Sequence, residues 1–510
     1  MIGQTLVNPR QDAPATSPLV RELPADLETP ASVYLKLAGQ GPSFLLESVT
    51  GGENLARYSF IGARPSQAFI LKGHTFEVHD LVTGGIRRQA AGLDPMGLIR
   101  AEFARYQSAP PPGLPRFTGG LVGYLGYEMM HYFEPGVPLQ PYPELPDAIY
   151  LLVDSLVAFD HAYGKMLLIA NGFTGEAGVC DPAAARARLS EMEACLGKPM
   201  PDRTEGHSTA PTAFRSNLTR QAFKQAVQQA KEYIAAGDIF QVVLSQRLTR
   251  PTHADPFSIY RALRRLNPSP YMFFFDFDHL AGDPPLHLIG ASPEMHVRLE
   301  GQVATLRPIA GTRPRGATPA QDARLEEELL ADPKERAEHV MLVDLARNDL
   351  GRVCDYGSVH VPEQMVIERY SHVMHIVSQT VGRLRPGLDA FDLLKATFPA
   401  GTVSGAPKIR AMQIIHELEN SPRGPYAGAT GYIATSGAMD TCITLRTLVM
   451  RGQEISLQAG AGIVADSDPD GEYQETLNKA RALAQAVALA EGEKDAPILI
   501  EGADYDRRDR

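Results

Sequence analysis

The order of strand-like and helix-like segments is the feature that most limits how this chain can fold. Apolar and β-branched runs at 43–47, 67–71, 150–159 and 166–170 mix irregularly with helical patches, such as the one at 98–106. A doubly wound parallel sheet would need steady alternation of strands and helices. Neither that alternation nor an internal repeat is visible. The pattern therefore predicts an α+β fold built on large, mostly antiparallel β-sheets.

Composition divides the chain into two folded regions. Residues 1–18 are polar and Pro-rich and predict a flexible tail, and residues 19–196 form the first region. Residues 197–213 are rich in Pro, Ser, Thr and charge with little periodicity, which is typical of a linker. The second region covers residues 214–492, and the charged residues 493–510 predict a second tail.

The second region begins with an amphipathic helix. Gly237 stands where this helix is expected to end. The apolar positions at helical spacing are Phe223, Val227, Ala230 and Ile234. Strands are predicted at 239–247, 441–450 and 454–458, and the last two form a hairpin around 451–453.

The charge balance and the cysteines limit partners and location. With 49 basic and 60 acidic residues the net charge is −11, which disfavours a nucleic-acid partner. An anionic substrate would need local cations or a metal ion to offset the repulsion from this net negative charge. The four cysteines form no CxxC pair, so a reducing compartment is expected. No signal peptide or membrane-spanning run is visible, and the chain is expected to be cytoplasmic.

Two acidic pairs stand near predicted helix starts. Asp332 and Pro333 predict an N-cap and first helical residue, followed by Glu335 and Glu338 on one face. Glu335 can serve either as a capping partner or as part of a site.

The second pair, Glu472 and Glu475, has the same spacing near the start of another helix, and Lys479 follows on the same face. A solvated helix face would show the same spacing. Two such pairs in one region favour a glutamate from each helix holding one Mg²⁺, which prefers one or two protein carboxylates with substrate oxygens and waters.

Other polar residues stand in apolar surroundings. His372 and His375 lie in an extended segment, where residues three apart face opposite sides and cannot chelate together. His375 can face a site or be a hydrogen-bonded core residue. Arg446, in an apolar strand, needs either a structural carboxylate or a substrate carboxylate as partner. The loop at 401–408 enters a helix with Pro407 near its start, where free N–H groups favour an anion.

These motifs resemble those of a known family. Residues 308–313, PIAGTR, resemble the PI[A/K]GT signature of the chorismate-utilising enzymes. The order of motifs over residues 214–491 resembles the chorismate-binding domain of anthranilate synthase component I. The motifs are IFQVVLSQR, GASPE, PIAGTRPRG, ERAEHVMLVDLARND, GTVSGAPK, GYIATSGAMDTCITLRT, QAGAGIV and ETLNKA. The resemblance implies antiparallel sheets packed as a sandwich with surrounding helices, a catalytic second region, and a regulatory region at 19–196.

The resemblance also implies an activity and partners. Chorismate and ammonia would give anthranilate and pyruvate, the first committed step of tryptophan biosynthesis, with feedback inhibition by L-tryptophan. No amidotransferase signature is evident in the chain. Ammonia would therefore come from glutamine on a separate amidotransferase subunit, in a heterotetramer of two large and two small subunits.

Catalytic and metal-binding roles follow by resemblance. Glu338 and Glu475 look like Mg²⁺ ligands, supported by Glu335 and Glu472. Glu294 resembles the acid that protonates the departing C4 hydroxyl. His375 and Thr402 look positioned for the loss of pyruvate, with the identity of the base between them left open.

Ligand contacts follow in the same way. The residues that resemble substrate contacts are Gly311, Thr312, Tyr426, Arg446, Gly460, Ala461, Gly462 and Lys479, with Glu335 and Glu472 beside the metal. The residues that resemble a tryptophan site are Glu47 and Ser48 of the LLES motif, and Asn267, Pro270, Tyr271 and Met272 of NPSPYM.

Two positions separate the branches of the family. Ala310 has no amine to attack a substrate, whereas aminodeoxychorismate synthase component I, the alternative within the family, usually has lysine there. Gln241 cannot deprotonate water, whereas the isochorismate synthases tend to carry lysine at this place. Both residues favour direct attack by ammonia. A catalytically inactive tryptophan-sensing subunit is a further alternative. It is disfavoured because the set of expected active-site residues is intact: Glu294, Thr312, Glu338, His375, Arg446 and Glu475.

Overall fold

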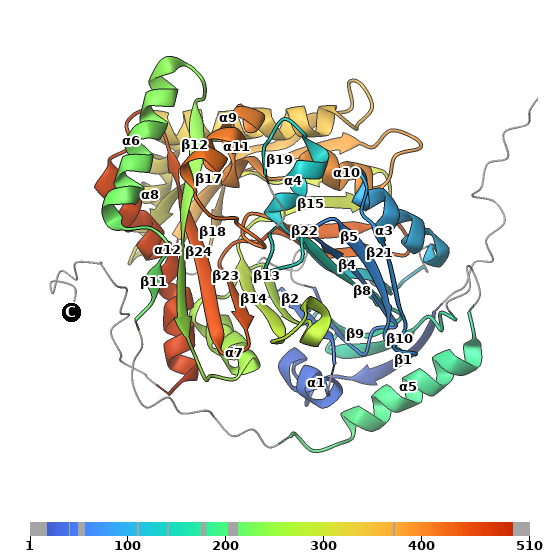
Figure 1. Ribbon diagram of the computed structural model, residues 1–510. Coiled ribbons are helices and arrows are strands. Elements are labelled where there is room, and N and C mark those ends of the chain that lie inside the picture. The colour runs from blue at the N-terminus through green and yellow to red at the C-terminus, as the bar shows by residue number, and fades with distance from the viewer. Residues whose placement is uncertain are drawn as a thin grey trace, which may run out of the picture.

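A computed structural model describes residues 18–39, 41–48, 57–109, 112–139, 142–174, 180–201, 213–370 and 373–492. Two large sheets of antiparallel strand pairs form the centre, and helices surround them (Figure 1). This confirms the predicted α+β sandwich. No helix within the described ranges is long and apolar enough to cross a membrane.

The first sheet takes its strands from both regions of the chain. Its order is β1 (Leu19–Pro24), β10 (Lys165–Ala170), β9 (Ser155–Asp160), β3 (Tyr58–Ala63), β2 (Ser43–Glu47), β13 (Tyr271–Asp276), β14 (Leu286–Ser292), β23 (Thr447–Arg451), β24 (Glu454–Ile463), β12 (Gln241–Pro251) and β11 (Arg215–Ser216), with β20 (Gly405–Ala406) beside β12. The two regions meet where β2 pairs with β13.

The second sheet is also shared. Its order is β17 (Ile309–Pro314), β19 (Val373–Arg383), β16 (Val303–Leu306), β15 (Met295–Glu300), β22 (Met439–Ile443), β21 (Ala429–Ala434), β7 (Gly120–Leu125), β8 (Ala148–Val153), β4 (Gln67–Lys72), β5 (Thr75–Asp80) and β6 (Ile86–Ala90), with β18 (His360–Arg369) beside β19. The regions meet again where β7 pairs with β21. Continuous sheet hydrogen bonding therefore joins the two regions.

Helices cover both sheets. They are α1 (Pro30–Leu37), α3 (Pro95–Phe103), α4 (Met130–Phe133), α5 (Pro182–Leu196), α6 (Arg220–Ala236), α7 (Pro256–Leu266), α8 (Pro319–Ala331), α9 (Pro333–Gly351), α10 (Ala390–Thr397), α11 (Lys408–Leu418) and α12 (Pro469–Ala490). Short 3₁₀ turns are η1 (Ala104–Tyr106), η2 (Tyr127–Met129), η3 (Asp278–Ala281) and η4 (Gly401–Val403). Helices α6 and α12 lie side by side against β12 and β24 (Figure 1).

Local signals placed several helix ends correctly. Gly237 ends α6 in the left-handed conformation, φ 85°, which glycine adopts without strain. The Asp332 side chain accepts hydrogen bonds from the N–H groups of Lys334 and Glu335 at the start of α9. Pro407 is the N-cap of α11 and not its first helical residue.

Two predicted strands are wrong in the same way. Residues 150–159 form not one strand but parts of two, β8 in the second sheet and β9 in the first, separated by Asp154. Residues 441–450 likewise divide into β22 and β23, so Arg446 lies between strands with φ 46°. In both places the chain crosses from one sheet to the other. An apolar run stays buried across such a crossing, so hydrophobicity alone does not mark it.

Candidate active site

Two neighbouring crossings between the sheets carry the central candidate residues. Glu294 lies between β14 and β15, and Arg446 lies between β22 and β23. The crossings are hydrogen-bonded to each other: the N–H of Ile443 donates to the carbonyl of Glu294 at 3.1 Å, and the N–H of Ala291 donates to that of Arg446 at 3.1 Å. Backbone hydrogen bonds therefore join the segment that carries an acid to the segment that carries a cation.

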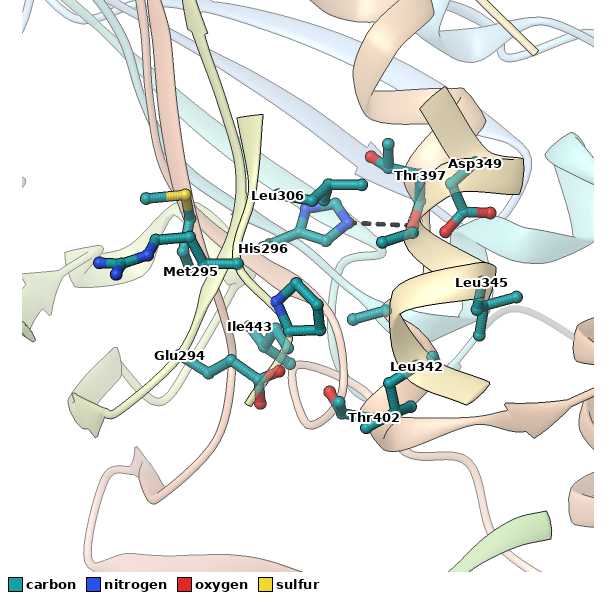
Figure 2. A pocket seen from close by; sticks show the side chains of 15 residues that line it. Glu294, Met295, His296, Leu306, Leu342, Leu345, Asp349, Thr397, Thr402 and Ile443 are labelled. Carbon is teal, nitrogen blue, oxygen red and sulfur yellow. Dashed lines mark hydrogen bonds between the residues drawn. The ribbon is translucent and has the colours of Figure 1, made fainter. Parts of the chain in front are cut away.

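Glu294 is buried and only 8% exposed. Burial raises the pKa of its carboxyl to about 8, against smaller lowering contributions from Thr402, the Ile309 N–H and the Lys479 charge. Its carboxyl and the Thr402 hydroxyl face each other across a pocket (Figure 2), although that hydroxyl closes no full hydrogen bond. A carboxyl with this pKa is largely protonated at neutral pH and can donate a proton.

The pocket beside Glu294 extends away from the crossing toward α9. Leu342, Leu345 and Asp349 line its wall on α9. At its far end His296 makes a 3.2 Å hydrogen bond to the carbonyl of Thr397 (Figure 2). The pocket gives a small leaving group space next to the Glu294 carboxyl.

Arg446 is a half-buried guanidinium without a carboxylate partner. Among the described residues no Asp or Glu lies within ion-pair distance of it, and its only hydrogen bond, at 3.4 Å, is to Oδ1 of Asn267. Loss of solvation lowers the pKa of Arg446. Such a cation is stabilised by an anionic ligand. The structural carboxylate considered from the sequence is therefore not found among these residues.

Strands β12 and β24 form one wall of the site. In their register Val243 faces Gly462 and Ser245 faces Gly460. A Cβ at Gly460 would lie 2.6 Å from the Tyr426 hydroxyl, and one at Gly462 would lie 2.8 Å from Nε2 of Gln241. The missing side chains therefore let Tyr426 and Gln241 approach the strand closely.

The neighbouring Ala461 has a different environment. It is fully buried, and alternation along β24 turns its side chain to the face opposite Gly460 and Gly462. The structure therefore does not bring the Ala461 side chain together with the other candidate residues on this wall.

The predicted acidic residues lie at the starts of α9 and α12. Gln241 Nε2 donates to Glu338 Oε1 at 2.8 Å, so β12 meets α9 here. Arg313 Nη1 donates to Glu335 Oε1 at 2.9 Å, and no capping box involves Glu335. The pKa of Glu472 is raised by burial and by the charge of Glu475. Carboxylates from two helices therefore approach one region.

Lys479 links α12 to the same wall. Its Nζ donates to the carbonyl of Gly460 at 2.9 Å and pairs with Glu475 at 2.7 Å. The charge of Lys334, from α9, acts on Glu472 of α12, which places the two helix starts near each other.

The donor chemistry at these helix starts fits a Mg²⁺ ion completed by substrate and water. Glu338 is half-buried and Glu475 is exposed, so a ligand can reach both carboxylates. Within the described ranges no group of three or more His, Cys, Asp or Glu side chains forms a ready metal cluster. The residues present therefore match an open site with one or two protein ligands and not a closed cage.

His375 lies on β19 opposite β17. Its Nδ1 is 3.0 Å from the carbonyl of Gly311 and 3.0 Å from the hydroxyl of Thr312. A carbonyl only accepts, so Nδ1 carries the proton and Nε2 keeps a free lone pair. Burial lowers the pKa of His375, and the charge of Arg446 lowers it further. The imidazole is therefore neutral and able to accept a proton. His372 lies outside the described residues.

The predicted tryptophan-site residues also come together, away from the acidic helices. Strand pairing puts Met272 directly opposite Glu47. The Ser48 hydroxyl and the Nδ2 of Asn267 are buried and have no hydrogen-bond partner within the described part of the chain. Glu47 accepts hydrogen bonds from Tyr260 at 2.6 Å and from Arg264 at 3.0 Å. The Ser48 hydroxyl and the Asn267 amide can therefore hydrogen-bond a ligand.

Two members of this predicted set differ from the rest. Pro270 is buried beside Asn267 at the start of β13. The Tyr271 hydroxyl is held by Asp440 at 3.1 Å and by Arg298 at 3.3 Å, in the second sheet. The structure therefore commits the Tyr271 hydroxyl to a different network.

Sequence reasoning missed one buried group near the site. Arg423 and Glu419 form a buried ion pair between the Thr402 turn and β12. Their four-residue spacing was visible, but an exposed helix pair would show the same spacing. The Lys408 ammonium of the GTVSGAPK loop is buried against Asp349 at 2.8 Å, so it does not face the loop.

Comparison with known proteins identifies the class. A family model described as chorismate binding enzyme matches residues 42–485, and the chain belongs to this family. Within it, the chain is 49% identical to anthranilate synthase component 1 of Pseudomonas putida, over 93% of this chain and 96% of the relative. The protein of the same name from Pseudomonas aeruginosa is 49% identical with the same coverage. The chain thus falls among the proteins named anthranilate synthase component 1.

A solved structure agrees with this placement. Anthranilate synthase component I from Streptococcus pneumoniae matches with a TM-score of 0.74 and 36% identity, covering 90% of this chain and 98% of the other. The predicted family is confirmed.

Proposed function

We propose that this chain converts chorismate and ammonia to anthranilate and pyruvate, as the large subunit of a two-component enzyme. The observation that carries the proposal is the pair of hydrogen-bonded crossings: one carries a carboxyl with a pKa of about 8, and the other carries a guanidinium that has no carboxylate partner among the described residues. Chorismate is a dicarboxylate with a hydroxyl to be expelled. It needs cations to hold its charges and an acid to protonate the leaving oxygen.

In the first step ammonia attacks C2 of the ring and the C4 hydroxyl departs. Glu294 donates its proton to that hydroxyl, which leaves as water into the adjoining pocket. Arg446, with Lys479 and the glycines of β24, binds substrate carboxylates. Bound Mg²⁺, held by Glu338 and Glu475, would neutralise the ring carboxylate. Ala310 and Gln241 offer neither an amine nucleophile nor a base for water, so ammonia attacks directly.

In the second step the enolpyruvyl side chain is lost. Nε2 of His375 takes the proton from C2 while the bond between C3 and the ether oxygen breaks. The ring becomes aromatic, and the released enolpyruvate takes up a proton to give pyruvate. Thr312 holds the imidazole in the required tautomer together with the Gly311 carbonyl. Thr402 orients the Glu294 carboxyl and is not itself a base in this scheme.

The partner and the regulation belong to the same proposal. The name component 1 of the relatives implies a second component, and we expect an amidotransferase that releases ammonia from glutamine, in a heterotetramer with two copies of each chain. L-tryptophan would bind at Ser48 and Asn267, whose buried polar groups have no partner among the residues that the structure describes. The contact between Asn267 and Arg446 joins that site to the substrate cation. A cytoplasmic location is consistent with free cysteines at 180, 195, 354 and 442.

A direct test uses the purified chain alone. Mixed with chorismate, Mg²⁺ and an ammonium salt at alkaline pH, it should form fluorescent anthranilate, whereas glutamine should give no product. Formation of a 4-amino product instead would favour aminodeoxychorismate synthase component I. Absence of any product under these conditions would contradict the proposal.

A further inference from the structure

A buried ion pair connects the strands and turns that carry the candidate catalytic groups. Arg423 and Glu419 lie just beyond the end of α11, with side chains 1% and 5% exposed. The guanidinium donates Nε to Glu419 Oε2 at 2.8 Å and Nη2 to Oε1 at 2.6 Å. A buried pair of this kind commonly contributes little net stability, because desolvation offsets the attraction. The other hydrogen bonds of the pair therefore show which parts of the chain it holds in place.

The remaining donors of Arg423 reach two separate parts of the site. Nη1 donates to the carbonyl of Val403 at 2.8 Å, in the turn that presents Thr402 to Glu294. Nη2 donates to the carbonyl of Val243 at 2.7 Å, two residues from Gln241 on β12. One planar group thus fixes the spacing between these two backbones.

Glu419 extends the network to the glycine wall. Its Oε1 accepts from the N–H of Ser245 at 2.6 Å and from the Ser245 hydroxyl at 2.9 Å. Ser245 is the register partner of Gly460, and its hydroxyl also accepts from Gln458 at 2.8 Å. The Arg423 guanidinium lies 5.5 Å from the ring centre of Tyr426, whose hydroxyl meets Gly460. These contacts therefore lie beside two candidate substrate-binding residues, Gly460 and Tyr426.

The first region of the chain contributes the last contact. Glu128, on η2, is buried and accepts from the N–H groups of Arg423 at 2.7 Å and Gly424 at 2.8 Å. The Tyr127 ring lies 4.8 Å from the guanidinium. The loop that carries Arg423 and Tyr426 is therefore held from both regions.

From this geometry we propose that Arg423 and Glu419 are positioning residues, which set the Thr402 turn, β12 and Tyr426 in their catalytic arrangement. The inference rests on the proposed function. A displacement of about 1 Å in catalytic groups can cost about 10²-fold in rate. Loosening this pair should therefore lower kcat while leaving chorismate binding through Arg446 and Lys479 largely intact.

A second buried Arg–Glu pair supplies a matched control. Arg250 and Glu491 are ion-paired with side chains 5% and 3% exposed, and Arg250 also lies on β12. Nine residues separate Arg250 from Gln241, about 30 Å along the strand. Arg250→Lys and Arg423→Lys make the same chemical change at similar burial, but only the second touches the site.

The experiment measures anthranilate formation from chorismate and ammonium by the wild-type chain, Arg423→Lys and Arg250→Lys. We expect Arg423→Lys to lose about 10²-fold in kcat with KM changed less than about threefold, and Arg250→Lys to stay within about twofold of wild type in both. The alkaline limb of the pH profile should also move to higher pH in Arg423→Lys, because a displaced Thr402 no longer lowers the pKa of Glu294. Lys479 and the Ile309 N–H, which also act on Glu294, are unchanged.

Several outcomes would overturn the inference. Wild-type kcat in Arg423→Lys, or an equal loss in Arg250→Lys, would assign the pair a structural role only. If Arg423→Lys fails to fold, Glu128→Gln tests the same loop, and an unchanged kcat there would count against the inference. A wild-type chain without turnover would overturn the proposed reaction itself, which separates the two failures.

Discussion

The two ends of the candidate site both carry glutamate side chains, but the two environments differ in their exposure to solvent. At the crossing between the sheets, Glu294 is buried in apolar surroundings and its pKa rises to about 8. At the starts of α9 and α12, Glu338 and Glu475 remain partly open to solvent. Solvation therefore decides which carboxyl can act as an acid and which can bind a cation.

Removing the solvent-accessible carboxylates should have the largest effect. We expect Glu338→Ala and Glu475→Ala each to lower activity by about 10³-fold or more, since metal-type charge stabilisation is worth several kcal/mol. Asp344→Ala is a control on the exposed face of α9. Titration calorimetry with Mg²⁺ and chorismate checks metal binding directly. Full turnover in excess EDTA would refute the metal assignment.

Replacing the buried acid tests the other end. Glu294→Gln should lower kcat by about 10²–10⁴-fold, the usual range for a general acid. In the wild type, kcat/KM should fall as pH rises through about 8, because the carboxyl then loses its proton. If the fall in activity above about pH 8 persisted in Glu294→Gln, another group would be donating the proton.

The same group makes stability depend on pH. The pKa of Glu294 is raised from 4.5 to about 8 in the folded chain. The stabilising contribution of its protonated form is therefore complete below pH 4.5 and is lost as pH rises through about 8. In the wild type the free energy of unfolding, measured by denaturant titration, should fall as pH rises from 4.5 to about 8. In Glu294→Gln it should fall less steeply over the same range. Identical slopes would mean that Glu294 titrates normally.

A smaller effect should separate the two chemical steps. His375→Ala should slow pyruvate loss by about 10²-fold while ammonia addition continues, so an aminated intermediate that retains the enolpyruvyl group accumulates. Chromatography of quenched reactions detects it as a new ultraviolet-absorbing species formed before pyruvate. His416→Ala, on the exposed face of α11, is the control. Parallel loss of chorismate consumption and pyruvate release would refute this division of labour.

The smallest expected effect concerns regulation. Ser48→Ala or a change at Met272 should weaken inhibition by tryptophan about tenfold, with catalysis without tryptophan preserved. Coupling between sites is typically 5–150-fold and is reciprocal. Chorismate with Mg²⁺ should therefore weaken tryptophan binding by the same factor as tryptophan weakens chorismate binding. Calorimetry that gives the same tryptophan affinity with and without chorismate would exclude the coupling.

Sequence patterns were most reliable where the signal is local. The end of α6 at Gly237 and the start of α9 at Asp332 depend on residues within one helical turn. The pairing of LLES with NPSPYM is different, because β2 and β13 are more than two hundred residues apart. The association of these two motifs came from the resemblance to a family, because the periodicity of a sequence does not show which distant strands pair. The Arg423–Glu419 pair was missed because its contacts come from three distant segments.

The sequence by itself determined the family, the α+β class, and the identity of the acids, the histidine and the arginine that can do the chemistry. Only the tertiary structure showed the solvent exposure and the partners of each of these side chains. At the crossings Glu294 is buried, and Arg446 has no carboxylate partner in the described ranges, whereas Glu338 and Glu475 keep access to solvent. Solvation and partner charges depend on everything packed around a side chain, and no local run of residues contains that information.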